Sequence, residues 1–376
     1  MCKKIKILNL SSHLGIGGSE IQLRLVSLSL SQKKYEMAIL IYNNSDHFVF
    51  NDELRKKGIK IYQSNFNNSL LKLIHTLYVI ITFKPKIIHS WNSYINPIAY
   101  FLGKLFFVKK IIGSVRGSPK NEFIRYKSWR KKLYLLGNNI VVNSNEIIKE
   151  LKEIGLKTNN AIYIPNLIEE SKKSDNKTKE NYIKEYKISK NDFVFVNVGN
   201  YRKEKNQKFL IEIINYLSHS ISNIKCLIVG QTIAGQENVY YELCNLIDKY
   251  GLQEKVILTG FIKDTASIID LADIYIHTSI SEGTSNALLE AMQLGKCIVT
   301  TEIGGAKDLI IQNENGIILP CNNLNENLDV INFSNKLIEL FHNKTLRESL
   351  GKNANIFIKE NFKHSNIICL YDKIYN

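Results

Sequence analysis

The sequence predicts an α/β protein with two doubly wound parallel sheets, in two domains that face each other across a cleft. Short β-branched apolar runs alternate with helical patterns through both halves of the chain, which is the order expected of parallel sheets covered by helices. Between the halves, Glu169–Asn181 is polar and charged without hydrophobic periodicity, as in a linker. The 376 residues suffice for two domains, which we expect at residues 1–170 and 186–360.

The strands expected before the linker are short runs rich in isoleucine and valine. They are Ile5–Leu10, Tyr35–Tyr42, Ile59–Tyr62, Ile87–Ser90, Lys110–Val115, Ile140–Asn143 and Ile162–Pro165. The segments between them have helical periodicity at Ser19–Leu30, Asp52–Lys57, Leu70–Phe83, Pro97–Phe107, Phe123–Leu136 and Glu146–Glu153.

After the linker the same alternation resumes. The expected strands are Phe193–Val198, Cys226–Val229, Lys255–Leu258, Ile274–His277 and Cys297–Thr301. The expected helices between them are Asn206–Leu217, Tyr240–Tyr250 and Ala266–Ala272, followed by one that ends at Gly295. Ligands of such sheets bind beyond the carboxyl ends of the strands, so we expect the site in the cleft between the domains.

The stretch Ser279–Ile310 predicts a phosphate site. Thr284 or Ser285 is suited to begin a helix, because a short hydroxyl side chain accepts hydrogen bonds from free backbone N–H groups, and Gly295 is suited to end it. The N-terminus of a helix attracts phosphate, since its N–H groups are unpaired and its dipole is positive there. Gly283, just before this helix, lets the backbone approach a ligand closely.

Two carboxylates accompany the predicted phosphate site. Glu282 precedes the helix, and Glu290 lies among its apolar positions. The Glu290 carboxylate can accept two hydrogen bonds from a vicinal diol such as a ribose. A phosphate site beside a diol acceptor indicates a nucleoside diphosphate. The alternative is that Glu282 is a solvated loop residue and Glu290 points outward.

The pair Glu282 and Glu290, spaced E-x7-E within SEGTSNALLEAMQLGK, resembles the signature of the family 4 retaining glycosyltransferases, which have the GT-B fold. The resemblance runs from about Ile5 to the C-terminus and is closest over Val198–Pro320. It implies transfer of a sugar from a UDP-hexose or UDP-N-acetylhexosamine to a hydroxyl of a lipid-linked or surface-polysaccharide acceptor, as in capsule or lipopolysaccharide assembly. The first domain would hold the acceptor and the second the donor, with a terminal helix, residues 361–376, packed back on the first.

The loop after Phe193–Val198 carries the cations that the resemblance requires. The family pattern is R-x4-K, in which the arginine and the lysine bind the donor diphosphate. Lys205 matches the lysine, Asn200 stands at the arginine position, and Arg202 lies two residues later. Either Arg202 substitutes from a shifted loop, or the enzyme works with one cation fewer.

The resemblance also assigns the remaining donor contacts. Lys205 and Arg202 would stabilise the leaving diphosphate, Glu290 would bind the ribose, and Glu282 would orient the sugar hydroxyls or stabilise the cationic face of the sugar. Further donor contacts are implied for the residues that match the family's loops and the helix start: Gly17, Gly18, Asn200, Phe261, Gly283, Thr284, Ser285, Asn286, Gly304 and Gly305.

Two residues of the first half are candidates for the acceptor side. His89 ends the strand Ile87–Ser90; a lone histidine there is more often structural, but the family has a histidine at this place, beside the reaction centre. Arg116, in GSVRGS, follows another strand and would meet a phosphate or an acceptor carboxylate, or else form a surface salt bridge. The sequence contains no D-x-D carboxylate pair, and we expect neither a bound metal nor a cofactor.

The net charge of +15 is concentrated in the first half, where residues 101–140 contain many basic residues and the single acid Glu122. Helical spacing within Phe123–Leu136 places Tyr126 and Trp129 on one face with basic groups around them, which suits a helix lying on an anionic membrane surface. An ordinary domain helix with a solvated basic rim is the alternative, and we do not expect nucleic-acid binding. The membrane-surface candidates are Arg125, Lys127, Trp129, Arg130, Lys131 and Lys132.

The sequence gives no sign of a signal peptide or a bilayer-spanning segment. The start, MCKKIKILNLSSH, fits a first strand, and every apolar window is shorter than the roughly 18 residues that a span requires. We therefore expect a cytoplasmic protein, peripheral on the inner face of a bacterial cell membrane. Two alternatives stay open: a non-catalytic nucleotide-sugar or membrane-surface binding protein, and another GT-B enzyme such as a nucleotide-sugar epimerase.

Overall fold

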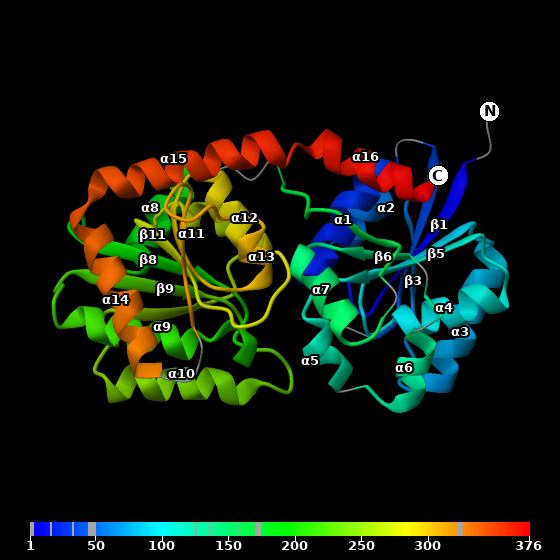
Figure 1. Ribbon diagram of the computed structural model, residues 1–376, viewed down its shortest axis with the longest axis horizontal. Coiled ribbons are helices and arrows are strands. Elements are labelled where there is room, and N and C mark those ends of the chain that lie inside the picture. The colour runs from blue at the N-terminus through cyan, green and yellow to red at the C-terminus, as the bar shows by residue number, and fades with distance from the viewer. Residues whose placement is uncertain are drawn as a thin grey trace. The chain divides into compact units, whose positions relative to one another are not determined.

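The protein is described from a computed structural model, which places residues 4–15, 17–31, 34–43, 50–124, 126–134, 136–137, 139–156, 158–169, 174–321 and 326–376. The chain divides into two compact units (Figure 1). One comprises Met1–Leu167 with His364–Asn376, and the other Ile168–Lys363. Each unit contains a parallel sheet with helices, which confirms the predicted α/β fold class with two doubly wound sheets.

The sheet of the first unit has, in the described ranges, seven parallel strands in the order β3-β2-β1-β4-β5-β6-β7. The strands are β1 (Ile5–Ser11), β2 (Tyr35–Ile41), β3 (Lys60–Gln63), β4 (Ile87–Ser90), β5 (Lys110–Val115), β6 (Asn139–Val142) and β7 (Ala161–Tyr163). The chain builds outward from β1 to β3 and then returns to the other side of β1 with β4. The carboxyl ends of β1 and β4 therefore flank the topological switch point, where such sheets bind ligands.

The helices of the first unit are α1 (Gly18–Ser31), α2 (Asn51–Lys56), α3 (Ser69–Phe83), α4 (Asn96–Leu105), α5 (Pro119–Ile124), α6 (Ser128–Tyr134), α7 (Asn145–Glu153) and α16 (His364–Tyr375). The terminal helix α16 packs against α1. Its Asp372 accepts a hydrogen bond from the Tyr35 hydroxyl at 2.8 Å, and its Ile374 carbonyl accepts one from the Lys110 amine at 2.9 Å. The last residues of the chain thus belong to the first unit.

The prediction of one helix over Phe123–Leu136 is wrong. Helix α5 ends at Ile124 and α6 begins at Ser128, so Tyr126 lies between two short helices. The reason is aromatic packing: the Tyr126 ring lies 5.4 Å from that of Phe123 and 6.4 Å from that of Tyr134, at the edge of a buried cluster. Tyr126 is therefore half-buried, whereas Trp129 is 53% exposed, and Arg125 lies outside the described residues.

The sheet of the second unit has, among the residues described, six parallel strands in the order β10-β9-β8-β11-β12-β13. The strands are β8 (Phe193–Val198), β9 (Ile224–Val229), β10 (Val256–Gly260), β11 (Ile274–His277), β12 (Cys297–Thr301) and β13 (Ile317–Leu319). The short strand β13 was not expected. Here the chain reverses direction across the sheet between β8 and β11, so their carboxyl ends form the second switch point.

The helices of the second unit are α8 (Asn176–Glu185), α9 (Gln207–Ser218), α10 (Glu237–Lys249), α11 (Thr265–Ile269), α12 (Asn286–Gln293), α13 (Gly304–Lys307), α14 (Glu326–His342) and α15 (Lys344–Asn361), with a 3-10 turn η1 (Lys203–Lys205). Gly295 adopts φ +70° directly after the C-cap residue of α12, as predicted for the residue that ends this helix. In the described parts of the chain, no helix combines the length and the apolar character needed to cross a bilayer.

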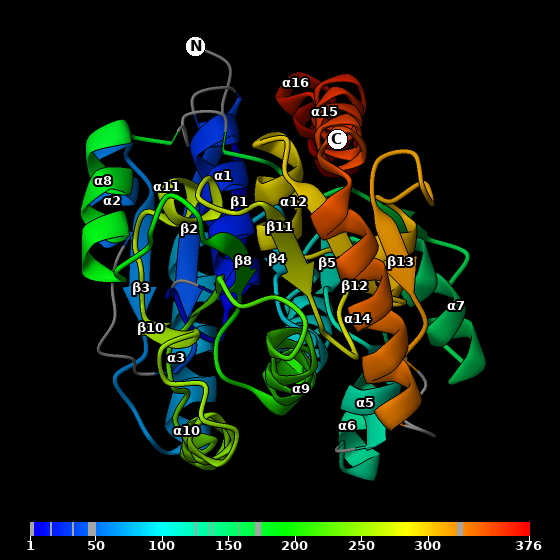
Figure 2. The same cartoon turned by 90° about the vertical axis from the view of Figure 1, so that its left-hand side faces the viewer.

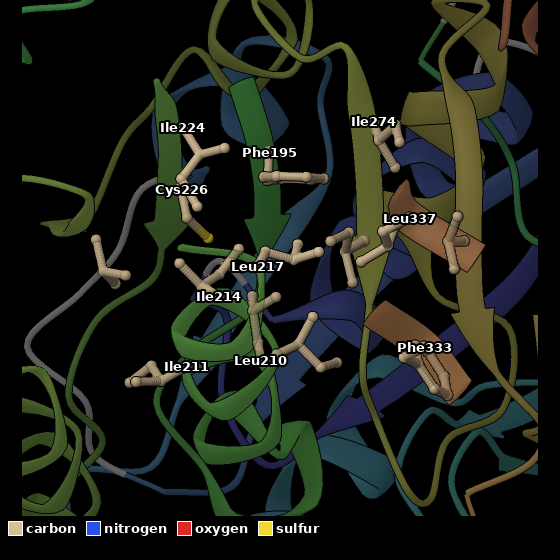
Figure 3. Packing of buried hydrophobic residues seen from close by; sticks show 14 of the residues in the cluster. Phe195, Leu210, Ile211, Ile214, Leu217, Ile224, Cys226, Ile274, Phe333 and Leu337 are labelled. Carbon is tan, nitrogen blue, oxygen red and sulfur yellow. The ribbon is translucent and has the colours of Figure 1, made fainter. Parts of the chain in front are cut away.

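The core of the second unit lies where α9 covers the sheet. Leu210, Ile214 and Leu217 of α9 point toward Phe195 of β8 and Cys226 of β9, and all five side chains are buried (Figure 3). Helix α9 lies between α10 and α14, which enclose this core further (Figure 2). This packing fixes the positions of β8 and β11, and with them the loops that leave their carboxyl ends.

The expected linker Glu169–Asn181 is not wholly without structure, because α8 begins at Asn176. Lys179 of α8 and Ser174 each lie 2.7 Å from one carboxylate oxygen of Asp270, and Lys296 lies 3.0 Å from the other. Burial alone would raise the pKa of Asp270, but these hydrogen bonds and the charge of Lys296 lower it to about 2. The Asp270 carboxylate thus anchors α8 to the second unit.

Replacing Asp270 by asparagine is expected to lower the free energy of unfolding at neutral pH by about 1–2 kcal/mol, after allowance for solvent screening. Because the pKa of Asp270 is lower in the folded state, its contribution is complete above pH 4 and is lost as the pH falls toward 2. The difference between parent and variant in urea unfolding should therefore shrink below pH 4. Glu348→Gln, in an exposed pair with Lys344, is the control and should change stability by less than about 0.5 kcal/mol.

Candidate functional site

The loops that follow β8 and β11 are joined at the switch point of the second unit. The Thr278 hydroxyl donates to the Lys205 carbonyl at 2.9 Å, and the Ile280 N–H donates to the Glu204 carbonyl at 2.9 Å. Residues separated by more than seventy positions are thereby held side by side, because β8 and β11 are neighbours in the sheet.

Lys205 and Glu282 form an ion pair across these two loops. Both side chains are mostly buried, with exposed fractions of 22% and 15%. The Ser279 hydroxyl also donates to the Glu282 carboxylate. The stem of Lys205 passes over Gly199, where a Cβ atom would lie 3.1 Å from the Lys205 Cδ. Two of the residues predicted for catalysis are therefore in direct contact.

His277 belongs to the same cluster, although the sequence interpretation did not include it. It is the last residue of β11, is 1% exposed, and its Nε2 lies 3.6 Å from Glu282 Oε1. Burial alone would raise the pKa of Glu282, but Lys205 and His277 hold it well below its usual range. Glu282 is therefore a carboxylate anion. The signal available in the sequence was a polar residue at the end of an apolar strand.

Two glycine loops meet beside this ion pair. A Cβ atom on Gly305 would lie 2.0 Å from the Gly283 carbonyl oxygen and 2.6 Å from the Thr284 nitrogen, so this contact admits only glycine at position 305. Ser285 occupies the N-cap position of α12, but its side chain makes no capping hydrogen bond, contrary to the expected reason for a hydroxyl there. Gly304 and Gly305 begin α13, and Asn286 begins α12.

The other predicted donor residues of the second unit lie around these loops. Glu290, in α12, accepts a hydrogen bond from the Thr265 hydroxyl at 2.7 Å, so it does not simply point into solvent. Asn200 Oδ1 accepts from the Gln231 N–H at 3.4 Å. Phe261 is 50% exposed after the end of β10. Arg202 is exposed, and no residue in the described ranges forms a hydrogen bond or ion pair with its side chain.

His89 lies in the first unit, inside its core. The side chain is fully buried, with Nδ1 2.6 Å from the Tyr375 hydroxyl and Nε2 2.9 Å from the Ser114 hydroxyl. Its ring stacks on Trp91 at 4.6 Å. Burial, reinforced by the charge of Arg116, holds the pKa of His89 well below its usual range, so it is neutral. Here His89 connects β4 to α16 and β5, and its role beside an acceptor stays a prediction.

Arg116 forms no ion pair among the described residues. Its Nη1 donates to Asn166 Oδ1 and its Nη2 to the Tyr371 hydroxyl, each at 2.8 Å, and its guanidinium lies 4.8 Å from the Trp91 ring centroid. The alternative of a surface salt bridge therefore does not apply. In the same unit, Gly17 and Gly18 lie at the start of α1, and a Cβ atom on Gly17 would lie 2.3 Å from the Glu20 carboxylate.

A cavity of about 740 Å³ opens in the first unit next to Arg116. Three of the residues predicted for a membrane surface contribute to its wall: Lys127, Trp129 and Arg130. Lys131 and Lys132 are exposed on α6. Within the described ranges, no cluster of histidine, cysteine, aspartate or glutamate is arranged to hold a metal ion.

Replacing Lys205 by methionine is expected to destabilise the protein by about 2–4 kcal/mol, because it leaves the Glu282 carboxylate buried without its main partner. The double variant Lys205→Met, Glu282→Gln should recover a large part of this loss, since it removes both charges. Urea unfolding of Lys205→Met, of Glu282→Gln and of the double variant measures the coupling energy between the two side chains. Additive effects would contradict the ion pair.

Comparisons with known proteins identify the family of this chain. The model of the family described as glycosyl transferases group 1 matches residues 178–357. An uncharacterized glycosyltransferase of Methanocaldococcus jannaschii is 30% identical over 325 residues, covering 82% of this chain and 72% of its own. The UDP-Gal:alpha-D-GlcNAc-diphosphoundecaprenol alpha-1,3-galactosyltransferase of Escherichia coli is 26% identical over 189 residues, covering 50% of this chain and 45% of its own.

Among solved structures, the Anabaena protein HepE, in complex with UDP and glucose, matches with a TM-score of 0.84 at 16% identity and covers 98% of both chains. This likeness shows that the fold is GT-B. Together with the family model and the relative from Methanocaldococcus, it establishes that this chain is a member of the group 1 glycosyltransferase family.

Proposed function

We propose that this glycosyltransferase moves a hexose or N-acetylhexosamine from its UDP derivative to a hydroxyl of a lipid-linked or surface-polysaccharide acceptor, with retention at the anomeric carbon and without a metal ion. The observation that carries the proposal is the Lys205–Glu282 pair at the β8–β11 switch point, beside the start of α12. In this proposal Lys205 is the cation for the leaving diphosphate, and Glu282 beside it is the carboxylate for the sugar.

The donor diphosphate would lie at the start of α12. The backbone N–H groups around Thr284 and Asn286 and the positive end of the helix dipole attract phosphate. Lys205 would exchange its ion pair with Glu282 for one with the diphosphate, and Arg202, exposed in the same loop, supplies a second cation. Glu290 would bind the ribose hydroxyls, with Thr265 fixing the orientation of its carboxylate.

Departure of the diphosphate leaves a sugar with positive charge at its anomeric carbon. Lys205 and the N–H groups of α12 stabilise the negative charge that gathers on the leaving oxygen, and such preorganised groups contribute several kcal/mol, about 3 for a single donor. Glu282 remains anionic, held by His277 and Ser279, and stabilises the sugar cation. The acceptor hydroxyl would attack on the face that the diphosphate leaves, which retains the configuration, and its proton would pass to the departing diphosphate oxygen as the new C–O bond forms. No covalent intermediate is proposed.

Two relatives support the finer parts of the proposal. HepE was solved with UDP and glucose, and the enzyme of Escherichia coli is named for a UDP-sugar donor and a diphosphoundecaprenol acceptor. A lipid-linked acceptor would require the protein to reach a membrane surface.

The surface of the first unit favours such a peripheral membrane position, at the inner face of the cell membrane. Helix α3 exposes an apolar stripe in which Leu70, Ile74, Tyr78 and Ile81 are each at least half exposed. Helices α3 and α4 share a buried cluster, α4 packs against α6, and neither α3 nor α4 contains an acidic residue. An apolar stripe surrounded by basic residues and free of acidic ones is suited to bind the surface of an anionic bilayer.

Lys205→Ala should lower kcat/KM for sugar transfer by at least about 100-fold, because a charge on the leaving group is no longer stabilised. Transfer of radiolabel from UDP-glucose or UDP-N-acetylglucosamine to a short-chain diphosphate-linked N-acetylglucosamine measures this. Lys203→Ala, an exposed lysine in the same turn, is the control. Isomerised donor without labelled acceptor would instead indicate an epimerase, and donor binding without either reaction a binding protein.

Ile74→Glu with Tyr78→Glu should abolish sedimentation of the protein with vesicles of phosphatidylglycerol and phosphatidylcholine, because two carboxylates would enter the apolar stripe. Tyr241→Glu, on an equally exposed tyrosine of α10, is the control and should sediment like the parent. Equal sedimentation of all three proteins would contradict the assignment of α3.

A further inference from the structure

We propose that the cavity in the first unit binds an anionic glycan: a sugar ring against its aromatic wall and a phosphate or carboxylate group against its arginines. The inference rests on the proposed function in one respect, which is that this glycan would be the acceptor. The cavity lies within the first unit, and the proposal concerns its chemistry alone.

The wall of the cavity is rich in cations. Arg116, Lys127 and Arg130 line it, against the carboxylate of Glu122, which accepts a hydrogen bond from the Tyr126 hydroxyl at 3.4 Å. No described carboxylate forms an ion pair with Arg116 or Arg130. The electrostatic potential of such a pocket attracts anions.

Arg130 is held by aromatic rings. Its guanidinium lies 3.8 Å from the ring centroid of Tyr94, 5.4 Å from that of Tyr126 and 5.7 Å from that of Trp129. It also donates a hydrogen bond to the Tyr94 carbonyl. These contacts fix the plane of the guanidinium but leave its charge uncompensated, and a fixed planar fork suits two-point binding of carboxylate or phosphate.

Arg116 is held in the same manner, by neutral partners. Its two terminal nitrogens bind Asn166 and Tyr371, and its face covers Trp91. The Nε atoms of Arg116 and Arg130 are both buried and have no hydrogen-bond partner in the described part of the chain. A buried N–H group without a partner is unusual, and an anion in the cavity would offset the cost of leaving these groups unpaired.

The aromatic residues give the cavity its second property. The buried Trp91 forms the inner part of the wall, and the rings of Tyr94 and Trp129, which also line the cavity, are about half exposed. Rings that combine an apolar face with a polar edge suit a ligand that has both kinds of surface, as a sugar does. The volume of about 740 Å³ is within the usual range of ligand pockets, and is sufficient for a sugar with a charged substituent.

Both phosphate and carboxylate have the required geometry, so two kinds of glycan qualify: one linked through a diphosphate and one containing a uronic acid. Titration of the full chain with three ligands distinguishes these two kinds of glycan. The charged ligands are a short-chain diphosphate-linked N-acetylglucosamine and a glucuronic-acid disaccharide, and the neutral ligand is N,N′-diacetylchitobiose. We expect one of the charged glycans to bind at least 10-fold more tightly than the neutral one, with an affinity that falls as salt is added.

Arg130→Gln should weaken binding of that glycan by at least 10-fold and leave the weak binding of the neutral disaccharide unchanged. Arg55→Gln, an exposed arginine of α2, is the matched control and should bind like the parent. Arg130→Lys keeps the charge but loses the planar guanidinium, so its affinity for the charged glycan should lie between those of the parent and Arg130→Gln. A circular dichroism spectrum and melting curve like those of the parent show that each variant is folded.

Equal affinity for charged and neutral glycans, no binding of any of the three, or parental affinity in Arg130→Gln would overturn the inference. Binding of UDP is measured in the same samples. If UDP binds and the charged glycans do not, the cavity assignment fails and the donor site stands. If the charged glycans bind and UDP does not, the proposed transferase function fails and the anionic-glycan cavity stands.

Discussion

The ion pair between Lys205 and Glu282 is the contact on which the proposed donor site of the second unit depends. It joins the loops at the carboxyl ends of β8 and β11, where two mostly buried charges neutralise each other. Because either charge would be costly to bury alone, each side chain stabilises the buried position of the other. In the proposed reaction a diphosphate would compete with Glu282 for Lys205, and His277 and Ser279 would then remain as partial support for that carboxylate.

The basic side chains of the two units have different kinds of partner. In the second unit, the lysine at the switch point is paired with a carboxylate, so an anionic ligand must replace that partner. In the first unit, Arg116 and Arg130 are held by aromatic rings, amides and carbonyls, and an anion would meet charges that are already in place. This difference fits the roles proposed for the two units: a leaving group bound and released in every cycle in the second, and recognition of a charged group in the first.

The sequence predicted the sheets well, because β-branched runs between turns are a local signal. The family resemblance and the switch-point rule assigned Lys205 and Glu282 to one site, but they did not predict the ion pair between the two side chains. His277 was missed because nothing local distinguishes a strand-end histidine that supports a carboxylate from a structural one. The broken helix near Tyr126 and the helix within the expected linker depend on contacts beyond helical spacing, with Tyr134 in one case and Asp270 in the other. Hydrophobic periodicity in the sequence does not predict such contacts.

The most direct test of the account compares the affinities for UDP and uridine by calorimetry, in the parent and in Lys205→Met. If Lys205 binds the diphosphate and Glu290 binds the ribose, the parent should prefer UDP by at least about 100-fold. The variant should lose most of this preference and bind uridine as before. An unchanged ratio of the two affinities in Lys205→Met would contradict the central claim that this lysine holds the leaving diphosphate.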